Sequence, residues 1–550
     1  MRTGFDPRGF GGIGQLPHTR RVEQPPPRLA EPLAALSLAG DLGMGFALEH
    51  ALRVTYVAGR LAGTLGLGAE DRSNAFYVAL LHGIGCTADA HDLASVFAAD
   101  DIALKTAGAV LDDDDMVAGL RYVFTRAGTG GPAILRPVAI VRSLARGTST
   151  FRDGLRAHCE VGELLATRVG VPAIARDGLN ALFDRWDGKG VRGVGGLDLP
   201  LAARIFHVAK TATTFYDHYG PDAALAAVRA QSGRALQPAV AEAFLDVAAE
   251  QAVLSALGEP DLATMVLEME PAEPRLQLDA ERKTSLFEAI ADMADLKSPV
   301  FVGHSRAVAL LALASGRRLG VGASELGPLG RAALAHDLGR VGVPNTILDK
   351  PRALTAVDWE SVRLHAYHTE RILLRSEVLA PYAPIAGLHH ERLDGSGYHR
   401  GVRGPSIPPA ARLLAAADAY EALTSTRPHR PAQAPERAAA TVRADVRAGR
   451  LDGDSVEAVI AIAQGQPLRL MGGGRLSERE IEVLELLARG HSTRAVATRL
   501  AITEKTVRHH VEHIYDKLGV STRAAAVVAA IGEGRLADVD RIGPDETAGQ

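Results

Sequence analysis

Seven histidine and aspartate residues between positions 304 and 418 form a set that could bind divalent metal ions. Their side chains offer imidazole nitrogens and carboxylate oxygens without a thiolate, a donor set that suits Mn, Fe or Zn in a hydrolytic site. Two ions about 3.5–4 Å apart can activate water and bind both sides of a phosphoryl group. The set comprises His304, His336, Asp337, His365, His389, His390 and Asp418. Because Asp337 directly follows His336, its carboxylate could lie between the two ions.

Helical periodicity surrounds these residues and predicts the elements that position them. Apolar residues recur every three or four positions through two long stretches, with glycine or proline at the breaks, which is typical of packed α-helices. We therefore expect an all-α chain with two tandem helical domains and a small final unit. The predicted divisions are a disordered segment at 1–30, a first domain at 31–265, a linker at 266–278, a second domain at 279–463, a linker at 464–475, a final unit at 476–535 and a flexible tail at 536–550.

The two long stretches repeat one another, which indicates a duplication. His50 and His82 precede His304 and His336 by the same 254 residues. Other matched positions are His158 for His365, Gly83 for Asp337, Leu182 and Phe183 for His389 and His390, and Lys210 for Asp418. A cation at a ligand position opposes a cluster of metal ions. We therefore expect no two-metal hydrolysis in the first copy.

The first copy is expected to pack against the second copy or to sense a ligand. An alternative is a different metal or redox site, built from the three retained histidines with Cys86 and Cys159. A buried cysteine is usually an apolar core residue, which argues against this alternative.

Composition limits the classes of protein that the chain can belong to. The 550 residues predict three or four domains, and 47% hydrophobic residues are enough for several cores. A net charge of -4 excludes a globally basic nucleic-acid coat but allows a local DNA-binding unit. Two cysteines argue against a disulfide scaffold and fit a reducing cytoplasm. We find no signal peptide and no apolar run near the ~20 residues of a membrane helix.

Motifs in the second domain resemble the HD-GYP branch of the HD phosphohydrolase superfamily. They are AHDLGRVGVP (335–344), HAYHTERIL (365–373), HHERLDGSGYHRG (389–401) and AADAYEALTS (416–425). The resemblance implies a two-metal centre that hydrolyses a phosphodiester, with cyclic di-GMP as the usual substrate. It assigns one ion to His304, His336, Asp337 and Asp418, and the other to Asp337, His365, His389 and His390. Val300 stands where some members carry a glutamate for a third ion, so we expect two ions, preferably Mn or Fe.

Two departures from the family concern the substrate. Arg340 stands where the family has a lysine, and the two side chains are not equivalent as phosphate contacts. The signature Gly-Tyr-Pro is Gly397-Tyr398-His399, which alters the loop that receives the substrate. The predicted catalytic residues are Asp337 and Arg340, and the predicted substrate contacts are Arg340, Tyr398, Arg400 and Arg403.

The final unit resembles a LuxR-type helix-turn-helix over residues 474–535. Thr503 is a suitable N-cap for its third helix, which is expected to end before Gly519. The resemblance implies a recognition helix in the major groove and phosphate contacts from neighbouring elements. We predict Lys505, Arg508 and His509 at or near bases, and Thr503, Lys517 and Arg523 at phosphates.

These features together predict a cytoplasmic, DNA-binding transcriptional regulator with an HD-GYP-like phosphohydrolase domain. Its expected partners are double-stranded DNA and a nucleotide or cyclic dinucleotide, with no membrane. A homodimer is expected because such heads read two-fold half-sites. Two alternatives stay open, namely a transcription factor whose HD domain senses a nucleotide without turnover, and a phosphohydrolase that acts on another nucleotide.

Overall fold

The computed structural model describes residues 27–112, 114–249, 252–273, 275–465, 476–532 and 536. Within these residues the chain forms helices and isolated bridges but no strand, which confirms the predicted all-α class. Most of the predicted disordered segment, the second linker from 466 onward and nearly all of the predicted tail lie outside the described residues.

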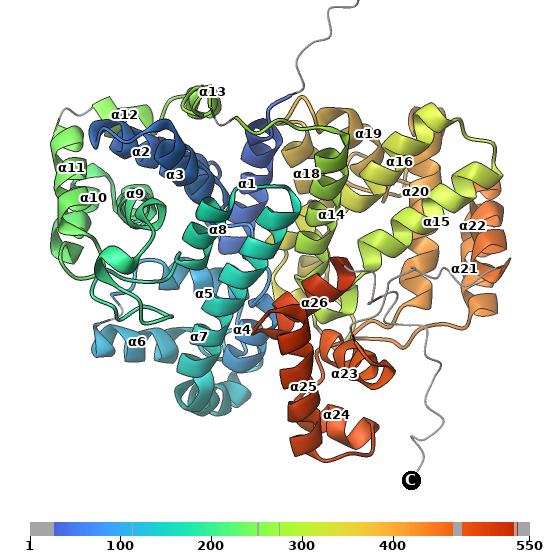
Figure 1. The fold of residues 1–550 in the computed structure, drawn as a ribbon. Coiled ribbons are helices and arrows are strands. Elements are labelled where there is room, and N and C mark those ends of the chain that lie inside the picture. Colours follow the sequence, from blue (N-terminus) through green and yellow to red (C-terminus); the bar gives the residue numbers. More distant parts are fainter. Residues whose placement is uncertain are drawn as a thin grey trace, which may run out of the picture.

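The first block is a helical unit that carries His50, His82 and His158. Figure 1 shows it on one side of the molecule. Its α-helices are α1 (Ala30–Met44), α2 (His50–Thr64), α3 (Ala69–Leu81), α4 (Ala90–Phe97), α5 (Asp101–Gly108), α6 (Met116–Arg126), α7 (Arg136–Arg168), α8 (Ala173–Asn180), α9 (Leu201–Tyr219), α10 (Pro221–Gln231), α11 (Pro238–Ala249), α12 (Ala252–Ala256) and α13 (Leu262–Glu268). The helices α2, α3 and α9 pack together around its core.

The second block lies on the other side and carries the predicted metal ligands (Figure 1). Its α-helices are α14 (Ala280–Asp295), α15 (His304–Arg318), α16 (Ala323–Ala335), α17 (Asn345–Leu348), α18 (Ala356–Leu373), α19 (Ala383–Ala386), α20 (Pro409–Thr424), α21 (Pro435–Arg447) and α22 (Gly453–Gly465). Two short 3-10 helices, η3 (Pro299–Phe301) and η4 (Leu338–Gly342), bound the region where these ligands meet.

Corresponding hydrogen bonds in the two blocks support the duplication. Asp41 accepts a hydrogen bond from the backbone N–H of Ala51 at 3.0 Å. Asp295, which lies 254 residues later, accepts one from the N–H of Ser305 at 2.9 Å. Each aspartate thereby joins the first helix of its block to the first turn of the next, so the two blocks begin in the same way.

A continuous apolar core joins the two blocks. The helix α1 packs against η4 and α18 of the second block. A buried ion pair crosses the same junction, where Lys297 Nζ lies 2.5 Å from Asp101 Oδ2 and both side chains are 0% exposed. The first block therefore packs directly against the segment that follows Asp337, which confirms one of the two roles expected for this block.

The final unit is a four-helix head, as predicted. Its helices are α23 (Glu478–Ala488), α24 (Thr493–Arg499), α25 (Glu504–Leu518) and α26 (Arg523–Gly532). Ser477 and Glu480 form a reciprocal capping box at the start of α23. Thr503 caps α25, which ends at Gly519 in the left-handed conformation.

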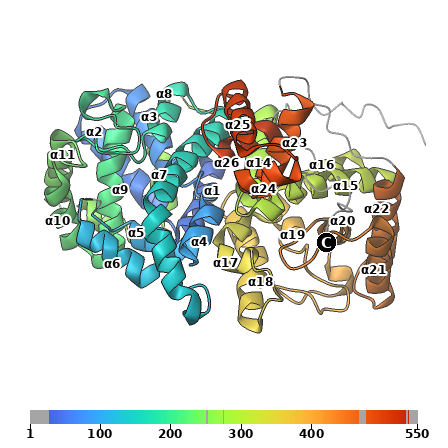
Figure 2. The same cartoon turned by 90° about the horizontal axis from the view of Figure 1, so that it is seen from below.

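The head is seated on the body through α26. Figure 2 shows α26 beside α7 and α14 near the junction of the two blocks. The guanidinium of Arg168 in α7 pairs with Asp292 of α14 and donates to the carbonyl of Val528 in α26, the latter at 3.2 Å. One side chain thus ties the head to both blocks.

Two expectations for the chain ends and linkers need correction. Residues 27–30 are ordered rather than disordered, because Leu29 is fully buried and its N–H donates to the carbonyl of Leu276 at 2.8 Å. The predicted linker at 266–278 begins inside α13, which continues to Glu268. Apolar burial and backbone pairing between these two segments outweigh their proline content.

Among the described residues, Pro299–Arg318 is long and apolar enough to cross a membrane by length and composition. The expectation that the chain has no apolar stretch of this length is therefore wrong. Its main helix, α15, packs against α14, α16, α20 and α22 and begins with the buried His304. These contacts explain its apolar character as that of a core helix.

Candidate metal centre and DNA-binding head

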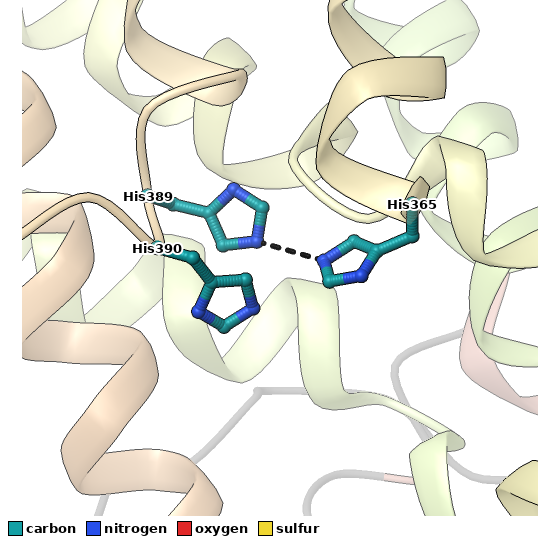
Figure 3. A group of neighbouring side chains, drawn as sticks. All are labelled: His365, His389 and His390. Atoms are coloured by element: carbon teal, nitrogen blue, oxygen red, sulfur yellow. Dashed lines mark hydrogen bonds between the residues drawn. The ribbon is translucent and has the colours of Figure 1, made fainter. Parts of the chain in front are cut away.

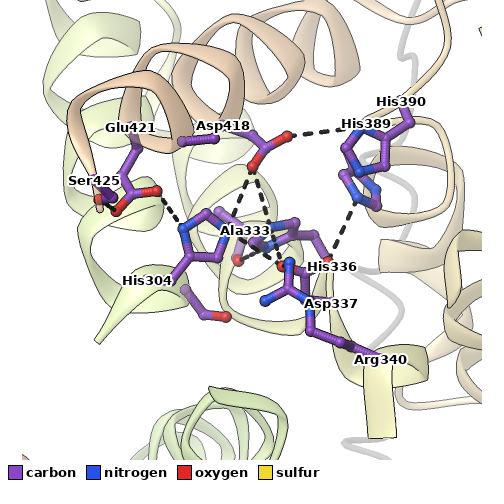
Figure 4. Close-up of polar contacts among 12 residues, drawn as sticks. His304, Ala333, His336, Asp337, Arg340, His389, His390, Asp418, Glu421 and Ser425 are labelled. Carbon is purple, nitrogen blue, oxygen red and sulfur yellow. Dashed lines mark hydrogen bonds and ion pairs between the residues drawn. The ribbon is translucent and has the colours of Figure 1, made fainter. Parts of the chain in front are cut away.

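The structure brings all seven predicted metal ligands into one buried cluster (Figures 3 and 4). The ligands come from positions far apart in the second block. His304 begins α15, His336 caps the end of α16, Asp337 precedes η4, His365 lies in α18, His389 and His390 follow α19, and Asp418 lies in α20. Helix ends and a tight loop therefore set the geometry of the cluster.

Asp337 lies between two groups of imidazoles. Its Oδ2 atom is 3.2 Å from His304 Nε2 and 3.0 Å from His336 Nε2. Its Oδ1 atom is 3.3 Å from His365 Nε2 and 3.7 Å from His389 Nε2. Donors that each lie about 2.1 Å from a shared ion are separated by roughly 3 Å. The carboxylate is therefore placed to contribute one oxygen to each of two sites.

Asp418 and His390 complete the two groups. Asp418 Oδ1 lies 3.4 Å from His304 Nε2, and Asp418 Oδ2 lies 3.8 Å from His390 Nδ1. In the other group, His365 Nε2 and His389 Nε2 are 3.2 Å apart (Figure 3). His365, His389 and His390 lie together, and so do His304, His336 and Asp418, while the assignment of each ligand to one ion stays a prediction.

Backbone carbonyls orient three of the imidazoles. The Nδ1 atoms of His336, His365 and His389 each bond the carbonyl oxygen three residues earlier, at 2.7, 2.5 and 2.6 Å. A proton on Nδ1 leaves Nε2 as the electron-pair donor, and all three Nε2 atoms face the cluster. Such contacts are typical of ligating histidines, because they set the tautomer and the ring direction.

Unsatisfied buried atoms support the fit of a metal to this cluster. The Nε2 atoms of His304 and His336 and both oxygens of Asp337 are buried without a hydrogen-bond partner, although Arg340 forms an ion pair with Asp337. Buried polar atoms are rarely left unpaired in native proteins. Nitrogen and oxygen donors that converge in this way fit divalent cations of the Mn, Fe or Zn type.

The protonation states of three of the five histidines suit metal binding, whereas burial would lower the pKa of His304 and His336 but the neighbouring carboxylates raise it. Burial lowers the pKa of His365 to about 4 and holds the pKa of His389 and His390 well below the usual range. These imidazoles are therefore neutral near pH 7. Burial alone would raise the pKa of Asp337, but Arg340 and the neighbouring histidines hold it well below the usual range. The central carboxylate is thus ionised.

Glu421 is a functional candidate that the sequence interpretation missed. Its carboxylate bonds the Nδ1 atom of His304 and is itself held by Ser425 Oγ at 2.5 Å (Figure 4). Because Nδ1 of His304 faces Glu421, its Nε2 atom faces Asp337. The sequence contained one signal for this residue, namely its spacing from Asp418. Glu421 follows Asp418 by three residues, so both side chains lie on the same face of a helix.

Arg340 and Tyr398, two of the predicted substrate contacts, lie at the cluster. The Arg340 guanidinium stacks 3.8 Å from the centre of the Phe301 ring, and its buried Nη1 atom has no hydrogen-bond partner. The Tyr398 ring lies 4.7 Å from the His390 ring. Both side chains are therefore placed beside the predicted ligands.

Arg400 and Arg403 are engaged in the surrounding loop. Arg400 pairs with Glu370 at 2.6 Å, and His399 Nε2 lies 2.8 Å from the same carboxylate. The Arg403 side chain packs against Gly395, since a Cβ atom added to Gly395 would lie 2.2 Å from Arg403 Nε. Glu370, which the sequence interpretation did not single out, therefore holds the loop in which histidine replaces the family's proline.

The first block is tightly packed at Gly83, the position of the missing bridging aspartate. A Cβ atom on Gly83 would lie 3.1 Å from the Cα atom of Gly40 in α1. His158 Nε2 forms a hydrogen bond with the carbonyl oxygen of His82 at 2.6 Å. A side chain at Gly83 would therefore require a small shift of α1.

The two cysteines do not join the histidines as a donor group. Among the described residues, the groups of donors close enough to hold a metal all lie in the second block. Cys86 and Cys159 are buried free thiols, and burial raises their pKa values to about 11 and about 12. Such thiols are protonated near pH 7 and behave as core side chains.

The predicted base contacts of the head lie on one accessible helix. Lys505, Arg508 and His509 are exposed on α25. The hydroxyl of Thr503 accepts from the N–H of Thr506 at 3.1 Å, so this predicted phosphate contact is also a helix cap. Within the head, α25 packs against α23, α24 and α26, and the three predicted base contacts lie outside this packing.

The other two predicted phosphate contacts already have acidic partners. Lys517 Nζ lies 2.7 Å from both oxygens of Glu480 within the head. Arg523 Nη2 lies 3.0 Å from Asp92 in α4 of the first block. A phosphate would have to compete with these carboxylates, and for Arg523 this competition opposes the docking of the head.

Comparisons with known proteins agree with both parts of this description. The family described as "HD domain" matches residues 288–454, and the family described as "Bacterial regulatory proteins, luxR family" matches residues 475–530. The 3'3'-cGAMP-specific phosphodiesterase 3 of Vibrio cholerae is 30% identical over 75% of this chain and 90% of its own length. A cyclic di-GMP phosphodiesterase of Thermotoga maritima is 44% identical over 18% of this chain and 27% of its own length.

A solved structure extends the similarity to the fold. The crystal structure of a cyclic GMP-AMP-specific phosphodiesterase of Vibrio cholerae matches with a TM-score of 0.57 and 26% identity. The match covers 80% of this chain and 98% of that chain. Both helical blocks are therefore shared with this protein.

Proposed function

The chain belongs to the HD-domain phosphodiesterase family, with a LuxR-type DNA-binding head at its C-terminal side, and we propose that it hydrolyses a cyclic dinucleotide. The observation that carries this proposal is the position of Asp337 between two groups of buried imidazoles. The second block is the proposed site of hydrolysis, and the first block has lost the equivalent carboxylates.

Two divalent ions, Mn or Fe by preference, would supply an activated water and neutralise the charge on the phosphodiester. Asp337 would bind both ions, with His304, His336 and Asp418 on one side and His365, His389 and His390 on the other. Arg340, through its unpaired Nη1 atom, would bind a phosphate oxygen. The Tyr398 ring, which lies against His390, would support a base or a ribose of the substrate.

The proposed reaction is the addition of one water molecule to a ring phosphodiester. The water oxygen forms a bond to phosphorus, one P–O ester bond breaks, and the released ribose oxygen takes a proton. The product is a linear dinucleotide with a terminal phosphate. We take 3'3'-cGAMP as the first candidate substrate, because the relative of that specificity aligns over nine-tenths of its own length. Cyclic di-GMP is the second, in view of the shorter match to a phosphodiesterase of that substrate.

A hydrolysis assay on the full chain tests this function. Purified protein is incubated with Mn or Fe and with 3'3'-cGAMP, cyclic di-GMP or a linear dinucleotide, and products are separated by chromatography. We expect cleavage of a cyclic dinucleotide by the unmodified chain and none by Asp337→Ala. Binding without turnover would instead support a nucleotide sensor, and cleavage of only the linear compound would support a phosphohydrolase for another nucleotide.

The head is proposed to read DNA as a cytoplasmic homodimer, with Lys505, Arg508 and His509 near bases. Exposed apolar residues on α6, on the 3-10 helix Ala133–Leu135 and on the start of α7 are suited to an interface between two copies, since isologous contacts pair one patch with itself. They include Met116, Val117, Leu120, Phe124, Ile134, Leu135, Val138, Val141 and Leu144. Light scattering on Val138→Glu should show a shift from dimer to monomer, and an unchanged mass would exclude this interface.

A further inference from the structure

A cavity of about 180 Å³ lies where the first block meets the DNA-binding head. Its walls include Cys159 and Phe183, with Arg156 and Arg192 beside them, and Ser521 of the head closes one side. The metal cluster of the second block does not line it. The cavity is therefore separate from the proposed site of hydrolysis.

The cavity occupies the place that corresponds to the substrate loop of the second block. Phe183 precedes its counterpart His390 by 207 residues, and Arg156 precedes Arg363 by the same number. In the second block, His390 and Arg363 both flank Tyr398, with the His390 ring at 4.7 Å and the guanidinium of Arg363 at 5.9 Å from that ring. The walls of the cavity are thus the counterparts of side chains around a predicted substrate contact.

The loop that shapes this place is retained in the first block. A Cβ atom on Gly190 would lie 2.4 Å from Asp184 Cα, and one on the equivalent Gly397 would lie 2.5 Å from Glu391 Cα. Asp184 accepts from the backbone N–H of Arg192 at 2.9 Å, as Glu391 accepts from that of Arg400 at 2.7 Å. The first block has therefore lost four of the seven metal ligands but kept the tight loop beside them.

Two arginines and two carboxylates line the cavity, and both carboxylates are already engaged, Glu160 by the head and Asp184 by Arg192. The remaining surface favours a flat apolar ring joined to an anionic group. Cys159, Phe183 and Val191 supply apolar surface, and Phe183 supplies an aromatic ring. Arg192 is held by Asp184 at 2.6 Å from its Nε atom, which leaves its terminal nitrogens for an anion. The volume is below the ~300–1,000 Å³ of sites that enclose drug-sized ligands, so the cavity can enclose the base of one nucleotide, with the sugar and phosphate at the open side beside the partly exposed Arg156 and Arg192.

We propose that this cavity binds one purine nucleotide unit without turnover and that the bound nucleotide holds the DNA-binding head against the body. The base would lie against Phe183, and the phosphate would meet Arg156 and Arg192. The unit is either a free mononucleotide or one half of a cyclic dinucleotide. This proposal does not depend on hydrolysis at the second block.

The contacts of the head explain why the nucleotide would favour docking. Ser521 lines the cavity only while the head is docked, when its N–H donates to Glu160 in α7 at 3.2 Å and Thr522 Oγ1 donates to the same carboxylate at 2.8 Å. A ligand shifts an equilibrium toward the state with which it makes more contacts. DNA that draws Arg523 away from Asp92 would in turn weaken nucleotide binding. The two effects are reciprocal, so DNA and nucleotide would lower each other's affinity by the same factor.

A fluorescence titration of the full chain tests the binding site. The chain has two tryptophans, so Trp359→Phe leaves Trp186, which lies in the retained loop, as the sole reporter. The protein is kept in EDTA to prevent turnover and is titrated with GMP, AMP or 3'3'-cGAMP. We expect a saturable change that weakens at least tenfold in Arg156→Ala. The control is Arg152→Ala, which removes another exposed arginine one turn earlier in α7 and should bind as before.

The outcomes separate the possible ligands and can overturn the proposal. Saturation by GMP or AMP identifies a mononucleotide site, and saturation by 3'3'-cGAMP alone identifies a site for half of a dinucleotide. Absence of saturation with all three, or equal affinity in Arg156→Ala and Arg152→Ala, would overturn the site. Both arginines are exposed, so neither variant is expected to unfold the chain.

Hydrogen exchange tests the effect on the head. In the same samples, nucleotide should slow amide exchange in α26 by several fold, because the docked state becomes more populated. Unchanged or faster exchange in α26 with a saturating nucleotide would overturn the coupling while leaving the site itself intact.

Discussion

The buried ion pair between Lys297 and Asp101 offers a strong test of how the two blocks support one another. Both side chains are 0% exposed, and their charged atoms lie 2.5 Å apart. Asp101 also accepts the backbone N–H of Asn345 at 2.8 Å, in the segment that follows η4. Replacing Asp101 with alanine therefore leaves a buried cation and a buried N–H without their partner.

The expected cost follows from this burial. Removal of one partner from a buried pair destabilises a protein by about 3–5 kcal/mol, because the remaining charge is uncompensated. Since each 1.4 kcal/mol is a factor of ten, Asp101→Ala should lower the folding equilibrium constant by roughly a hundredfold to three-thousandfold. The double variant Asp101→Ala/Lys297→Met removes both charges and should recover most of this loss.

Urea unfolding, followed by circular dichroism and by tryptophan fluorescence, measures these free energies. Trp186 lies in the first block and Trp359 in the second. If the unfolding curve from circular dichroism coincides with the curve from tryptophan fluorescence, the two blocks unfold together. Arg375→Ala is the matched control, since Arg375 pairs with Glu49 across the same junction but its side chain is 49% exposed. An exposed pair contributes about 0–1 kcal/mol. The reasoning is refuted if Asp101→Ala costs no more than Arg375→Ala, or if the double variant is as unstable as the single one.

Three further predictions concern the metal centre and the head. Glu421→Ala should weaken metal binding by about 10–100-fold, because Glu421 orients His304; metal analysis after dialysis measures this, and full retention would contradict the assigned role. Arg508→Ala should weaken DNA binding by about 1–3 kcal/mol and relax sequence preference in a gel-shift assay, whereas unchanged binding would place another face of α25 on DNA. Burial would raise the pKa of Glu480, but Lys517 and the cap at its helix start lower it to about 2. This carboxylate therefore stabilises the head above its unfolded pKa of about 4.3, and the contribution is lost as the pH falls toward 2. In Lys517→Met the acid-induced loss should be smaller and should end at a higher pH in a thermal melting series, and identical profiles would count against the pair.

Local signals account for what could be predicted about the elements. The capping box of Ser477 with Glu480 and the Thr503 cap act over three residues, so their residue types identify helix starts without knowledge of the rest of the fold. Gly519 likewise marks the end of α25 through its left-handed conformation. The four helices of the head could therefore be predicted from the sequence.

The metal-ligand set was also predictable, but its orientation was not. The ordered motifs indicate which histidines and aspartates form the centre. The sequence does not show that Asp337 divides its oxygens between two groups, nor that Glu421 turns His304 toward it. These facts depend on where α15, α18 and α20 cross, which is set by packing over long separations in the chain.

By itself, the sequence determined the all-α class, the duplication, the identity of the predicted metal ligands and the helices of the head. These properties follow from periodicity, short spacings and ordered motifs. Tertiary structure alone decided that Arg523 pairs with Asp92, that Lys297 pairs with Asp101, and that the head closes a cavity in the first block. The physical reason is that charge pairing and cavity formation require segments to meet that lie hundreds of residues apart, and no local pattern encodes such a meeting.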